Sequence, residues 1–340
     1  MSDSAHPEWI EVPLEVEPNL DGYRLDRFLK AKVVRLSRAR IQRIIDRGQV
    51  RSPRGETVTR AATRVHLGQR WILLRPAPSE PDVVMDYGVI HCDASLLVID
   101  KPAGLPVHPS ARYHRNTLTA LMRTRLGPGH GWEMAHRLDR ETSGIMVFGR
   151  RRTAPGRAGV TSGGVLKRSF QRREVHKAYL AIVRGTLASA VTVDFPLGRA
   201  LESEIQVKMA VRSVACGGAP AKTEFVPLRS AEFRGEAVTL VACRPWTGRQ
   251  HQIRVHLAAL GTPVLGDKIY GVEERAFLDV MENGRPVAEL EALAGFWRHA
   301  LHAHRIALPH PETGEERTFE AAWPPELAAI VPGPPTTLPV

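Results

Sequence analysis

The sequence predicts a protein of mixed helices and strands that is divided into two domains. Continuous apolar runs at residues 96–99 and 145–148 are typical of strands covered on both faces. Apolar residues with helical spacing occur in residues 37–48. Three prolines in the seven residues 75–81 indicate a stiff linker, where we place the domain boundary. With 340 residues, 43% of them hydrophobic, the chain can build one large and one small core.

These patterns divide the chain into five segments. The tail carries four prolines in ten residues, a composition that favours disorder. The segments are an acidic N-terminal segment at 1–21, a small domain at 22–75, a linker at 76–82, a large domain at 83–330 and the disordered tail at 331–340.

Positive charge is concentrated in two stretches. Residues 22–75 carry 15 basic and three acidic side chains, and residues 150–177 carry nine basic and one acidic. The formal net charge of the whole chain is only +11, so the remainder is net acidic. Such clustering is the electrostatic footprint of a protein that follows a phosphate backbone. It indicates a nucleic-acid partner rather than an evenly solvated basic surface.

The small domain is expected to combine two short helices with short strands. Leu25, Phe28 and Leu29 have the spacing of one helix face, which predicts an amphipathic helix. Residues 50–51 and 65–74 have the pattern of short strands that close the unit.

The second helix of the small domain is expected to carry a ridge of arginines. Ser37 is its expected N-cap and Gly48 its C-terminal stop, while Ile41 and Ile45 form the apolar stripe. At 100° per residue, the arginines at 40, 43 and 47 fall within about 60° of one another, away from that stripe. The side chains expected to bind RNA are Arg38, Arg40, Arg43 and Arg47.

Several classes of protein are disfavoured by composition. Cys92, Cys216 and Cys243 are far apart and form no CxxC pair, which argues against a disulfide framework and a zinc knuckle. His251 and His256, five residues apart, share neither a helix face nor a strand face, so we expect no metal site. No apolar run approaches the roughly 18 residues of a membrane span, and no secretion signal is evident. We expect a cytoplasmic protein that does not enter the membrane.

Residues 136–144, with the sequence His-Arg-Leu-Asp-Arg-Glu-Thr-Ser-Gly, give the strongest chemical signal. They place Asp139 between Arg137 and Arg140, directly before the buried strand at 145–148. Neighbouring arginines would hold this carboxylate ionised, which suits a nucleophile or an electrostatic stabiliser. An isolated Arg-Leu-Asp triplet is more often a structural ion pair, so the wider context decides.

These nine residues resemble the signature of the RluA family of pseudouridine synthases. Three further segments resemble other motifs of the family, in the same order, at 101–109, 177–185 and 244–257. The resemblance spans about residues 22–325. It implies an α+β catalytic domain with a mixed, mostly antiparallel central sheet around one cleft. Residues 22–75 resemble an S4-like RNA-binding module, a small fold of helices and loops.

The resemblance also assigns roles to side chains. Asp139 would attack C1′ of the target ribose to give a glycosyl ester, or remove the C2′ proton to give a glycal, and the sequence leaves both open. Arg254 would pair with this aspartate. Tyr179 would stack on the extruded base and assist proton removal at C5, and Arg137 would fill the gap that the base leaves. The family usually has Thr where this chain has Gln250.

The implied reaction breaks the N1–C1′ bond and joins C5 to C1′, so it consumes nothing and needs no cofactor. The expected partner is RNA, with large-subunit ribosomal RNA favoured and transfer RNA second, and we expect a monomer. A non-catalytic RNA-binding or ribosome-assembly factor would explain the charge, but not Asp139, Tyr179 and Arg254 together. A glycoside hydrolase would need a second carboxylate, for which Glu141 is the candidate.

A glycine-rich basic insert at 154–164 departs from the family, whose members usually have a plainer helical stretch there. It resembles no phosphate-binding fingerprint. We expect a mobile loop, with an RNA-contacting arm as the alternative.

Overall fold

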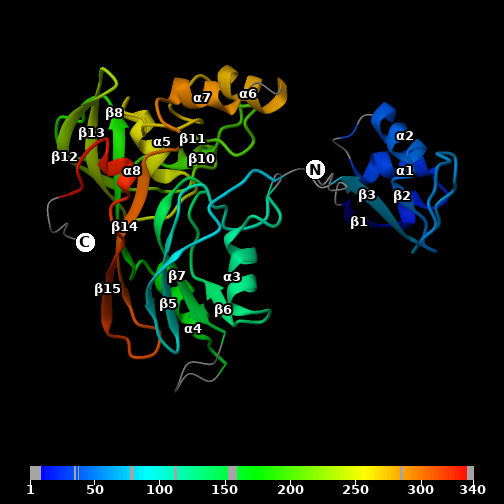
Figure 1. The fold of residues 1–340 in the computed structure, drawn as a ribbon, viewed down its shortest axis with the longest axis horizontal. Coiled ribbons are helices and arrows are strands. Elements are labelled where there is room, and N and C mark those ends of the chain that lie inside the picture. The colour runs from blue at the N-terminus through cyan, green and yellow to red at the C-terminus, as the bar shows by residue number, and fades with distance from the viewer. Residues whose placement is uncertain are drawn as a thin grey trace, which may run out of the picture. The chain divides into compact units, whose positions relative to one another are not determined.

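A computed structural model describes residues 9–33, 36, 38–76, 80–110, 113–151, 159–283 and 286–334. The chain forms two compact units, Met1–Glu80 and Pro81–Val340. The division falls within the proline-rich segment 76–82, and each unit has its own sheet and its own hydrophobic core (Figure 1).

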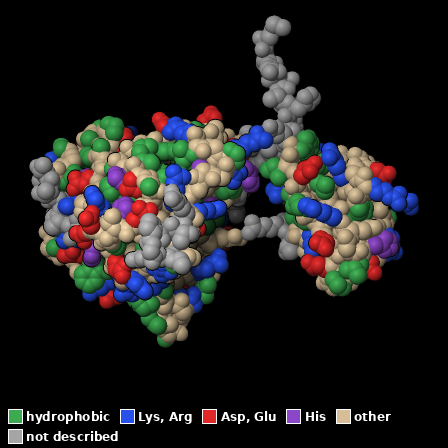
Figure 2. Space-filling view, turned by 90° about the horizontal axis from the view of Figure 1, so that it is seen from below, with side chains coloured by type: hydrophobic (Ala, Val, Ile, Leu, Met, Phe, Trp, Pro, Cys, Tyr) green, Lys and Arg blue, Asp and Glu red, His purple; other side chains and the backbone are tan. Residues whose placement is uncertain are grey.

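The smaller unit packs two helices on a three-stranded antiparallel sheet of order β1-β3-β2. Leu25, Phe28 and Leu29 are buried on the first helix, and Ile41 and Ile45 on the second, as their spacing predicts. Lys and Arg side chains are visible on the surface of this unit (Figure 2). Its elements are β1 (Trp9–Glu15), η1 (Pro18–Leu20), α1 (Leu25–Lys32), α2 (Arg38–Asp46), β2 (Val50–Arg51) and β3 (Arg70–Pro76).

Residues 9–21 belong to this unit, so the prediction that 1–21 is a separate acidic segment is wrong for them, while residues 1–8 lie outside the described residues. All seven residues of β1 pair with β3, and Val16 and Leu20 are buried in the core. Pro13 is tolerated because β1 is an edge strand. The strand predicted at 65–74 begins only at residue 70, because the chain turns at Gly68, where φ is +74°. Ser37, the expected N-cap, lies outside the described residues.

The larger unit is built on a mixed sheet that has ten strands in the described part of the chain. Its main path is β4-β5-β7-β14-β8-β13-β12-β9, with β15 beside β14 and β6 beside β7. The strands are β4 (Gly88–Cys92), β5 (Leu96–Lys101), β6 (Trp132–Met134), β7 (Ser143–Arg150), β8 (His176–Arg184), β9 (Val191–Val193), β12 (Thr223–Phe233), β13 (Glu236–Pro245), β14 (Leu301–Pro309) and β15 (Glu316–Glu320).

Helices and a separate two-stranded ribbon surround this sheet (Figure 1). The ribbon consists of β10 (Leu197–Arg199) and β11 (Met209–Val211), followed by η2 (Val214–Cys216). The helices are α3 (Leu118–Leu126), α4 (Ser162–Gln171), α5 (Gln252–Ala259), α6 (Glu274–Asn283), α7 (Val287–Ala294) and α8 (Pro325–Ala328).

One parallel junction joins two antiparallel parts of the sheet. Strands β7 and β14 pair in parallel through only two residue pairs, Ser143 with His302 and Gly144 with Ala303. The other strand pairs of this sheet are antiparallel in the described residues. Gly144 has φ +106°, and a Cβ there would overlap the carbonyl of Ala303. Only glycine permits this approach, which explains the last residue of the Asp139 motif.

The buried strands at 96–99 and 145–148 are confirmed as parts of β5 and β7. The sheet is mixed and mostly antiparallel, as the resemblance implies. The loop predicted at 154–164 is wrong at its end: Thr161 caps α4 by accepting a hydrogen bond from the Gly164 amide at 3.0 Å. Residues 152–158 lie outside the described residues.

The disordered tail predicted at 331–340 is wrong at its start. Val331 is completely buried in the core, and its carbonyl accepts a hydrogen bond from the Trp323 indole at 3.1 Å. Residues 335–340 lie outside the described residues.

Candidate active site

The loop that carries Asp139 lies between β6 and β7 and is anchored by a buried lysine. The ammonium of Lys101, at the end of β5, donates to the carbonyls of Pro102, Leu105 and Arg140, at 2.8, 3.0 and 3.1 Å. Hydrogen bonds of Lys101 thereby link the motif at 101–109 to the Asp139 loop. Burial, followed by the positive charge of Arg298, lowers the pKa of Lys101 to about 7.

Asp139 is bound by Arg254, which reaches it from α5. The Nη1 of Arg254 donates to Oδ2 of Asp139 at 2.8 Å. The same guanidinium is held by Asp267, with Nε to Oδ2 at 2.6 Å and Nη2 to Oδ1 at 2.8 Å. Oδ1 of Asp267 also accepts from the amides of Ile269 and Tyr270. Asp267, itself hydrogen-bonded to the backbone, therefore fixes the orientation of the Arg254 guanidinium towards Asp139.

Electrostatics keep this arrangement charged. Burial opposes the charge of Arg254, but the charge and hydrogen bonds of Asp267 raise its pKa overall. Burial likewise opposes the charge of Asp267, but Arg254 and the two backbone amides lower its pKa. The cation is thus permanent, and it supplies the partner that Asp139 needs.

The two carboxylate oxygens of Asp139 have different surroundings. Oδ2 lies 2.8 Å from Arg254 Nη1 and 3.8 Å from His251 Nε2. Oδ1 has no hydrogen-bond partner among the described residues. The Asp139 side chain is 26% exposed. One oxygen is therefore held by the protein, and the other is available to a reacting atom.

His251 orients a second donor towards Asp139. It has φ +55°, unusual for a residue other than glycine, and it precedes α5 directly. Its Nδ1 lies 2.8 Å from the Tyr270 hydroxyl, which accepts from the Met209 amide at 2.9 Å. If the hydroxyl donates to Nδ1, the imidazole proton is on Nε2, facing Asp139. Burial, followed by the charge of Arg254, lowers the pKa of His251 to about 4, so the ring is neutral at pH 7.

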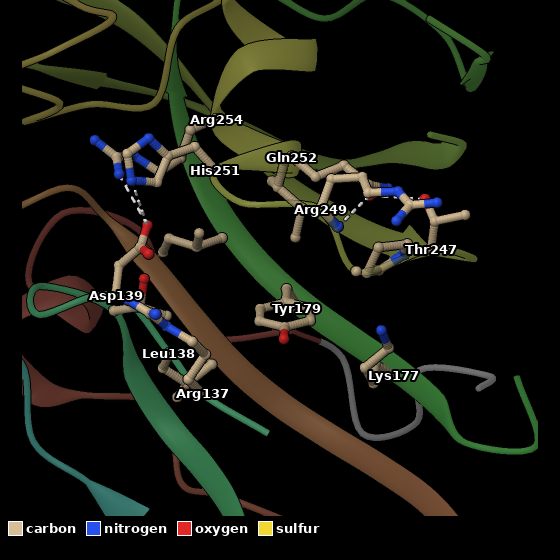
Figure 3. Close-up of a pocket in the computed structure, with 15 residues that line it drawn as sticks. Arg137, Leu138, Asp139, Lys177, Tyr179, Thr247, Arg249, His251, Gln252 and Arg254 are labelled. Carbon is tan, nitrogen blue, oxygen red and sulfur yellow. Dashed lines mark hydrogen bonds and ion pairs between the residues drawn. The ribbon is translucent and has the colours of Figure 1, made fainter. Parts of the chain in front are cut away.

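Tyr179 lies on β8, between Ala303 of β14 and Cys243 of β13. Burial, and then the charge of Asp139, raises the pKa of its phenol. The ring lines the same pocket as Asp139, as does Lys177, whose pKa burial lowers to about 8. Figure 3 shows the pocket, with Arg254 and His251 both reaching the Asp139 carboxylate.

All four predicted residues of the larger unit line this pocket: Arg137, Asp139, Tyr179 and Arg254. Arg137 is exposed. Gln250, the departure from the family pattern, donates to the carbonyl of Val207 on the segment before β11 at 3.4 Å. It does not line the pocket, so the substitution leaves the pocket wall unchanged.

Glu141 does not provide a second catalytic carboxylate. Its Oε1 accepts from Lys268 at 3.0 Å and from Arg140 at 2.8 Å, and its Oε2 accepts from the His299 amide at 3.1 Å. Arg140 therefore binds Glu141 rather than Asp139, which corrects the prediction that both flanking arginines hold the aspartate. Among the described residues lining the pocket, Asp139 is the single carboxylate. This arrangement disfavours a glycoside hydrolase.

The four arginines predicted to bind RNA are exposed on α2 and the turn after it. Arg38 also lies 3.8 Å from Asp26, a carboxylate that is bound more closely by Arg24.

No group of three or more potential metal ligands is present in the described part of the chain. No helix there has the length and apolar character needed to span a bilayer.

Sequence reasoning missed three residues of the site. Asp267 lies in a turn without a recognisable pattern, and Tyr270 follows it by three residues. The sequence pattern suggests for His251 only a role as a metal ligand, which its spacing from His256 disfavours. Its place beside Gln252, at the start of a helix, was the available signal, but the contact with Tyr270 depends on the tertiary fold.

Comparisons with known proteins identify the family of this chain. A family model described as RNA pseudouridylate synthase matches residues 95–259. The ribosomal large subunit pseudouridine synthase D of Zymomonas mobilis is 34% identical over 324 residues, covering 91% of this chain and 93% of that protein. The synthase D of Nitrosomonas europaea is 31% identical over 329 residues, covering 94% of this chain and 87% of that protein.

Solved structures give the same result. Human RNA pseudouridylate synthase domain containing 1 superposes with a TM-score of 0.54 at 28% identity, covering 77% of this chain and 94% of that chain. Human RNA pseudouridylate synthase domain containing 4 superposes with a TM-score of 0.51 at 27% identity. The chain thus belongs to the RNA pseudouridine synthase family, of the RluA type that its four motifs predict, and is an enzyme that isomerises uridine in RNA.

Proposed function

We propose that the protein converts specific uridines of large-subunit ribosomal RNA to pseudouridine, with Asp139 as the reacting group. The observation that carries the chemistry is the asymmetry of this carboxylate: Arg254 holds Oδ2, and Oδ1 is open to the pocket. The substrate is inferred from relatives over most of the chain that are named as large-subunit pseudouridine synthases.

Two routes are compatible with this geometry. Oδ1 attacks C1′, and the N1–C1′ electron pair leaves with the uracil, giving a glycosyl ester. Alternatively, Oδ1 removes the C2′ proton as that bond breaks, giving a glycal. In both routes the uracil turns, C5 joins C1′, the C5 proton is lost and N1 takes up a proton. In the first route the ester bond to Asp139 breaks as C5 joins C1′, and in the second Asp139 returns its proton to C2′, so the carboxylate is regenerated in both. A permanent cation at Oδ2 favours the ionised carboxylate with which both routes begin.

Tyr179 is proposed to contact the extruded uracil. Because burial and the charge of Asp139 raise its pKa, the phenol keeps its proton, so it is suited to stacking and hydrogen-bond donation rather than to removal of the C5 proton. Arg137, exposed at the pocket, is proposed to fill the space that the uridine leaves in the RNA.

The smaller unit is proposed to be an S4-like module that supplies affinity. Its exposed α2 arginines suit phosphate contacts, which give affinity without sequence choice. We further propose that the enzyme acts as a monomer in the cytoplasm, with which its three free cysteines agree.

The direct test is Asp139→Asn, assayed by release of tritium from 5-tritiated uridine in a large-subunit ribosomal RNA transcript. Turnover should fall by at least about 1,000-fold, while RNA affinity stays within a few fold. Asp86→Asn is a matched control, because Asp86 is 67% exposed and pairs with Arg125 outside the pocket. Substantial turnover by the Asp139 variant would overturn the assignment.

Pseudouridine mapping across total RNA, with and without the protein, tests the substrate. The proposal requires a uridine in large-subunit ribosomal RNA to lose its modification when the protein is absent. Loss confined to transfer RNA would show that the substrate is transfer RNA rather than large-subunit ribosomal RNA. No loss in any RNA would favour the non-catalytic ribosome-assembly alternative.

A further inference from the structure

A second pocket of the larger unit lies among α3, β6, β7 and α4, with a cavity volume of about 450 Å³. That volume is within the range of small-molecule sites in proteins. Nothing in the proposed isomerisation uses this pocket. It does, however, take residues from the second basic stretch at 150–177, whose charge the Asp139 site leaves largely unexplained.

The floor of the second pocket is apolar. Met122 of α3 and Phe148 of β7 are 2% and 1% exposed, and Trp132 of β6 is 7% exposed. The guanidinium of Arg150 lies 4.0 Å from the centroid of the Trp132 ring. It covers one face of the indole, and Met134, which is only partly buried, presents apolar surface to the pocket above the buried Met122 and Phe148. Such a floor suits a flat, weakly polar group.

The rim of the second pocket is basic. The side chains of Arg123 and Arg151 are exposed there, and neither has an acidic partner among the described residues. Lys167 also lines the pocket, but its charge is compensated by Glu133 at 2.5 Å. Two guanidinium groups beside an apolar floor match a nucleotide, which joins an anionic phosphate to a planar base.

A neutral histidine adds a hydrogen-bond donor to this rim. Nδ1 of His130 accepts from the Trp132 amide at 3.0 Å. Burial, followed by the charges of Arg151 and Arg150, lowers the pKa of His130. The proton of the neutral ring is therefore on Nε2, where it is available to an acceptor.

Leu138 and Arg137 connect the wall of the Asp139 pocket with that of the second pocket. Leu138 lines the Asp139 pocket and packs in the same core cluster as Met122, Trp132 and Phe148. Arg137 also lines the Asp139 pocket, and its charge is close enough to contribute, after burial, to the lowered pKa of His108 in the second pocket.

The separation suits a few nucleotides. Ser143 directly follows Thr142, which lines the Asp139 pocket. Phe148 of the second pocket is five residues farther along β7, or about 17 Å at the usual rise of a strand. Successive nucleotides of one strand are about 3.4 Å apart when stacked, and farther apart when unstacked. In Figure 2 the end of the larger unit that carries β6 and α4 faces the viewer, and Lys and Arg side chains are visible on it.

We propose that the second pocket binds one unpaired nucleotide of the substrate RNA, a few positions from the target uridine. The phosphate contacts Arg123 and Arg151, and the base lies against Met134, above the buried Met122 and Phe148. This rests on the proposed function and deepens it, because unpaired bases are the usual targets of sequence-specific RNA recognition. The pocket thereby contributes to the choice of uridine.

The charge of the rim is tested with a double variant, Arg123→Gln with Arg151→Gln, on a large-subunit ribosomal RNA transcript. Affinity should fall, and the slope of log affinity against log salt should decrease by about 1.5. Arg172→Gln with Arg173→Gln is the matched control, because these exposed residues follow α4 in the same basic stretch but do not line the pocket. Equal losses in both double variants would show general electrostatics and overturn the proposal.

The cavity itself is tested by filling it with Thr119→Phe, and independently with Met134→Trp in case the first variant unfolds. Both residues line the pocket, and neither is charged. Affinity should fall about 10-fold, the scale of one lost base contact, with an unchanged salt slope. If the filling variants fold and bind RNA as tightly as wild type, the proposal that the second pocket binds a nucleotide is overturned.

Wild-type turnover on the same transcript separates the hypothesis about the substrate from the hypothesis about the second pocket. Absent turnover would refute the proposed substrate. Normal turnover and normal affinity in every filling variant would refute only the proposal that the second pocket binds a nucleotide. Reduced affinity in the filling variants, with a normal rate of bound substrate, would support both.

Discussion

Two regions of the molecule hold arginine in opposite ways. Arg254 is 4% exposed and shared between two carboxylates. The arginines of α2 project from a solvated helix face. A buried, fully hydrogen-bonded cation keeps its geometry at any ionic strength, whereas exposed cations are screened and rearrange. The first arrangement suits chemistry at one oxygen atom, and the second suits a phosphate backbone of variable path.

Asp267→Asn gives the largest expected effect in this comparison. It removes one of the two charges that compensate Arg254, so breaking the buried pair should destabilise the fold by about 3–5 kcal/mol. Turnover should fall by at least about 100-fold, because second partners of this kind orient the groups that react. Denaturant unfolding and tritium release would measure the two effects.

The exposed pair of Arg184 and Glu236 is the matched control for that variant. It has the same two-bond geometry, at 3.0 and 2.9 Å, but Glu236 is 53% exposed. Glu236→Gln should cost less than about 1 kcal/mol and leave turnover unchanged. Equal losses of stability in the two variants would contradict the distinction between buried and exposed arginine.

Tyr270→Phe is expected to have the next largest effect. It removes the hydroxyl between Met209 and His251, so the imidazole is free to change tautomer. The single-turnover rate should fall about 10-fold with unchanged RNA affinity. The pKa of His251 is about 4 in the wild type, and loss of a donor to Nδ1 should raise it.

The pH profile distinguishes this positioning role from a general structural role. Wild-type rates should show no ionisation of His251 between pH 5 and 8, while the Tyr270 variant should gain an acidic limb that moves to higher pH. His251→Gln retains a side-chain N–H donor and should recover part of the rate that His251→Ala loses. Parallel pH profiles for wild type and Tyr270→Phe would exclude the positioning role.

Lys101 predicts a smaller, pH-dependent effect on stability. Unlike Arg254, its charge is held by carbonyl oxygens rather than by a carboxylate, and its pKa falls from 10.5 to about 7. Between these values the unfolded chain binds a proton that the folded chain lacks. From pH 7 to 8.5 this group should therefore raise the free energy of unfolding by up to about 1.4 kcal/mol per pH unit. Lys101→Met should lose that slope in denaturant titrations.

The smallest effect on chemistry is expected from replacing the ridge of α2. With Arg40, Arg43 and Arg47 changed to Gln, the slope of log affinity against log salt should decrease by about 2 to 3. Single-turnover rates at saturation should stay near wild type. The control set, exposed residues of the same unit outside α2, is Arg54, Arg60 and Arg70. An equal change in slope for both sets would show that total charge, rather than the ridge, binds RNA.

The order of motifs and the two buried strands were predictable from sequence because each is a local pattern. Strand β1 was missed for a different reason. Ile10, Val12 and Leu14 alternate with exposed residues as an edge strand requires, but the excess of acidic side chains in residues 1–21 predicts a segment apart from the small domain. Charge describes the solvent-facing side chains of such a strand and says nothing about its other face.

The site was only partly predictable because its geometry depends on contacts distant in sequence. Helix α5 is buried at every position from Gln252 to Leu257, so an apolar stripe does not reveal which way Arg254 points. The left-handed backbone of His251 has no signature in residue types. Asp267 joins Arg254 across 13 positions through a turn, which no periodic pattern encodes.

The short parallel junction of β7 with β14 has a consequence for biosynthesis. Asp139 precedes β7, whereas Tyr179 lies on β8, beyond β14, and Arg254 lies on α5, which follows β13. The junction pairs residues 143–144 with 302–303. Contacts so distant in sequence form late, after the loop between them has closed. A nascent chain that has not yet released β14 from the ribosome carries the three side chains proposed to act on the uridine but lacks the strand that brings them together. Activity should therefore appear abruptly, near the end of synthesis, and a chain truncated before residue 301 should be inactive even though Asp139, Tyr179 and Arg254 are all present.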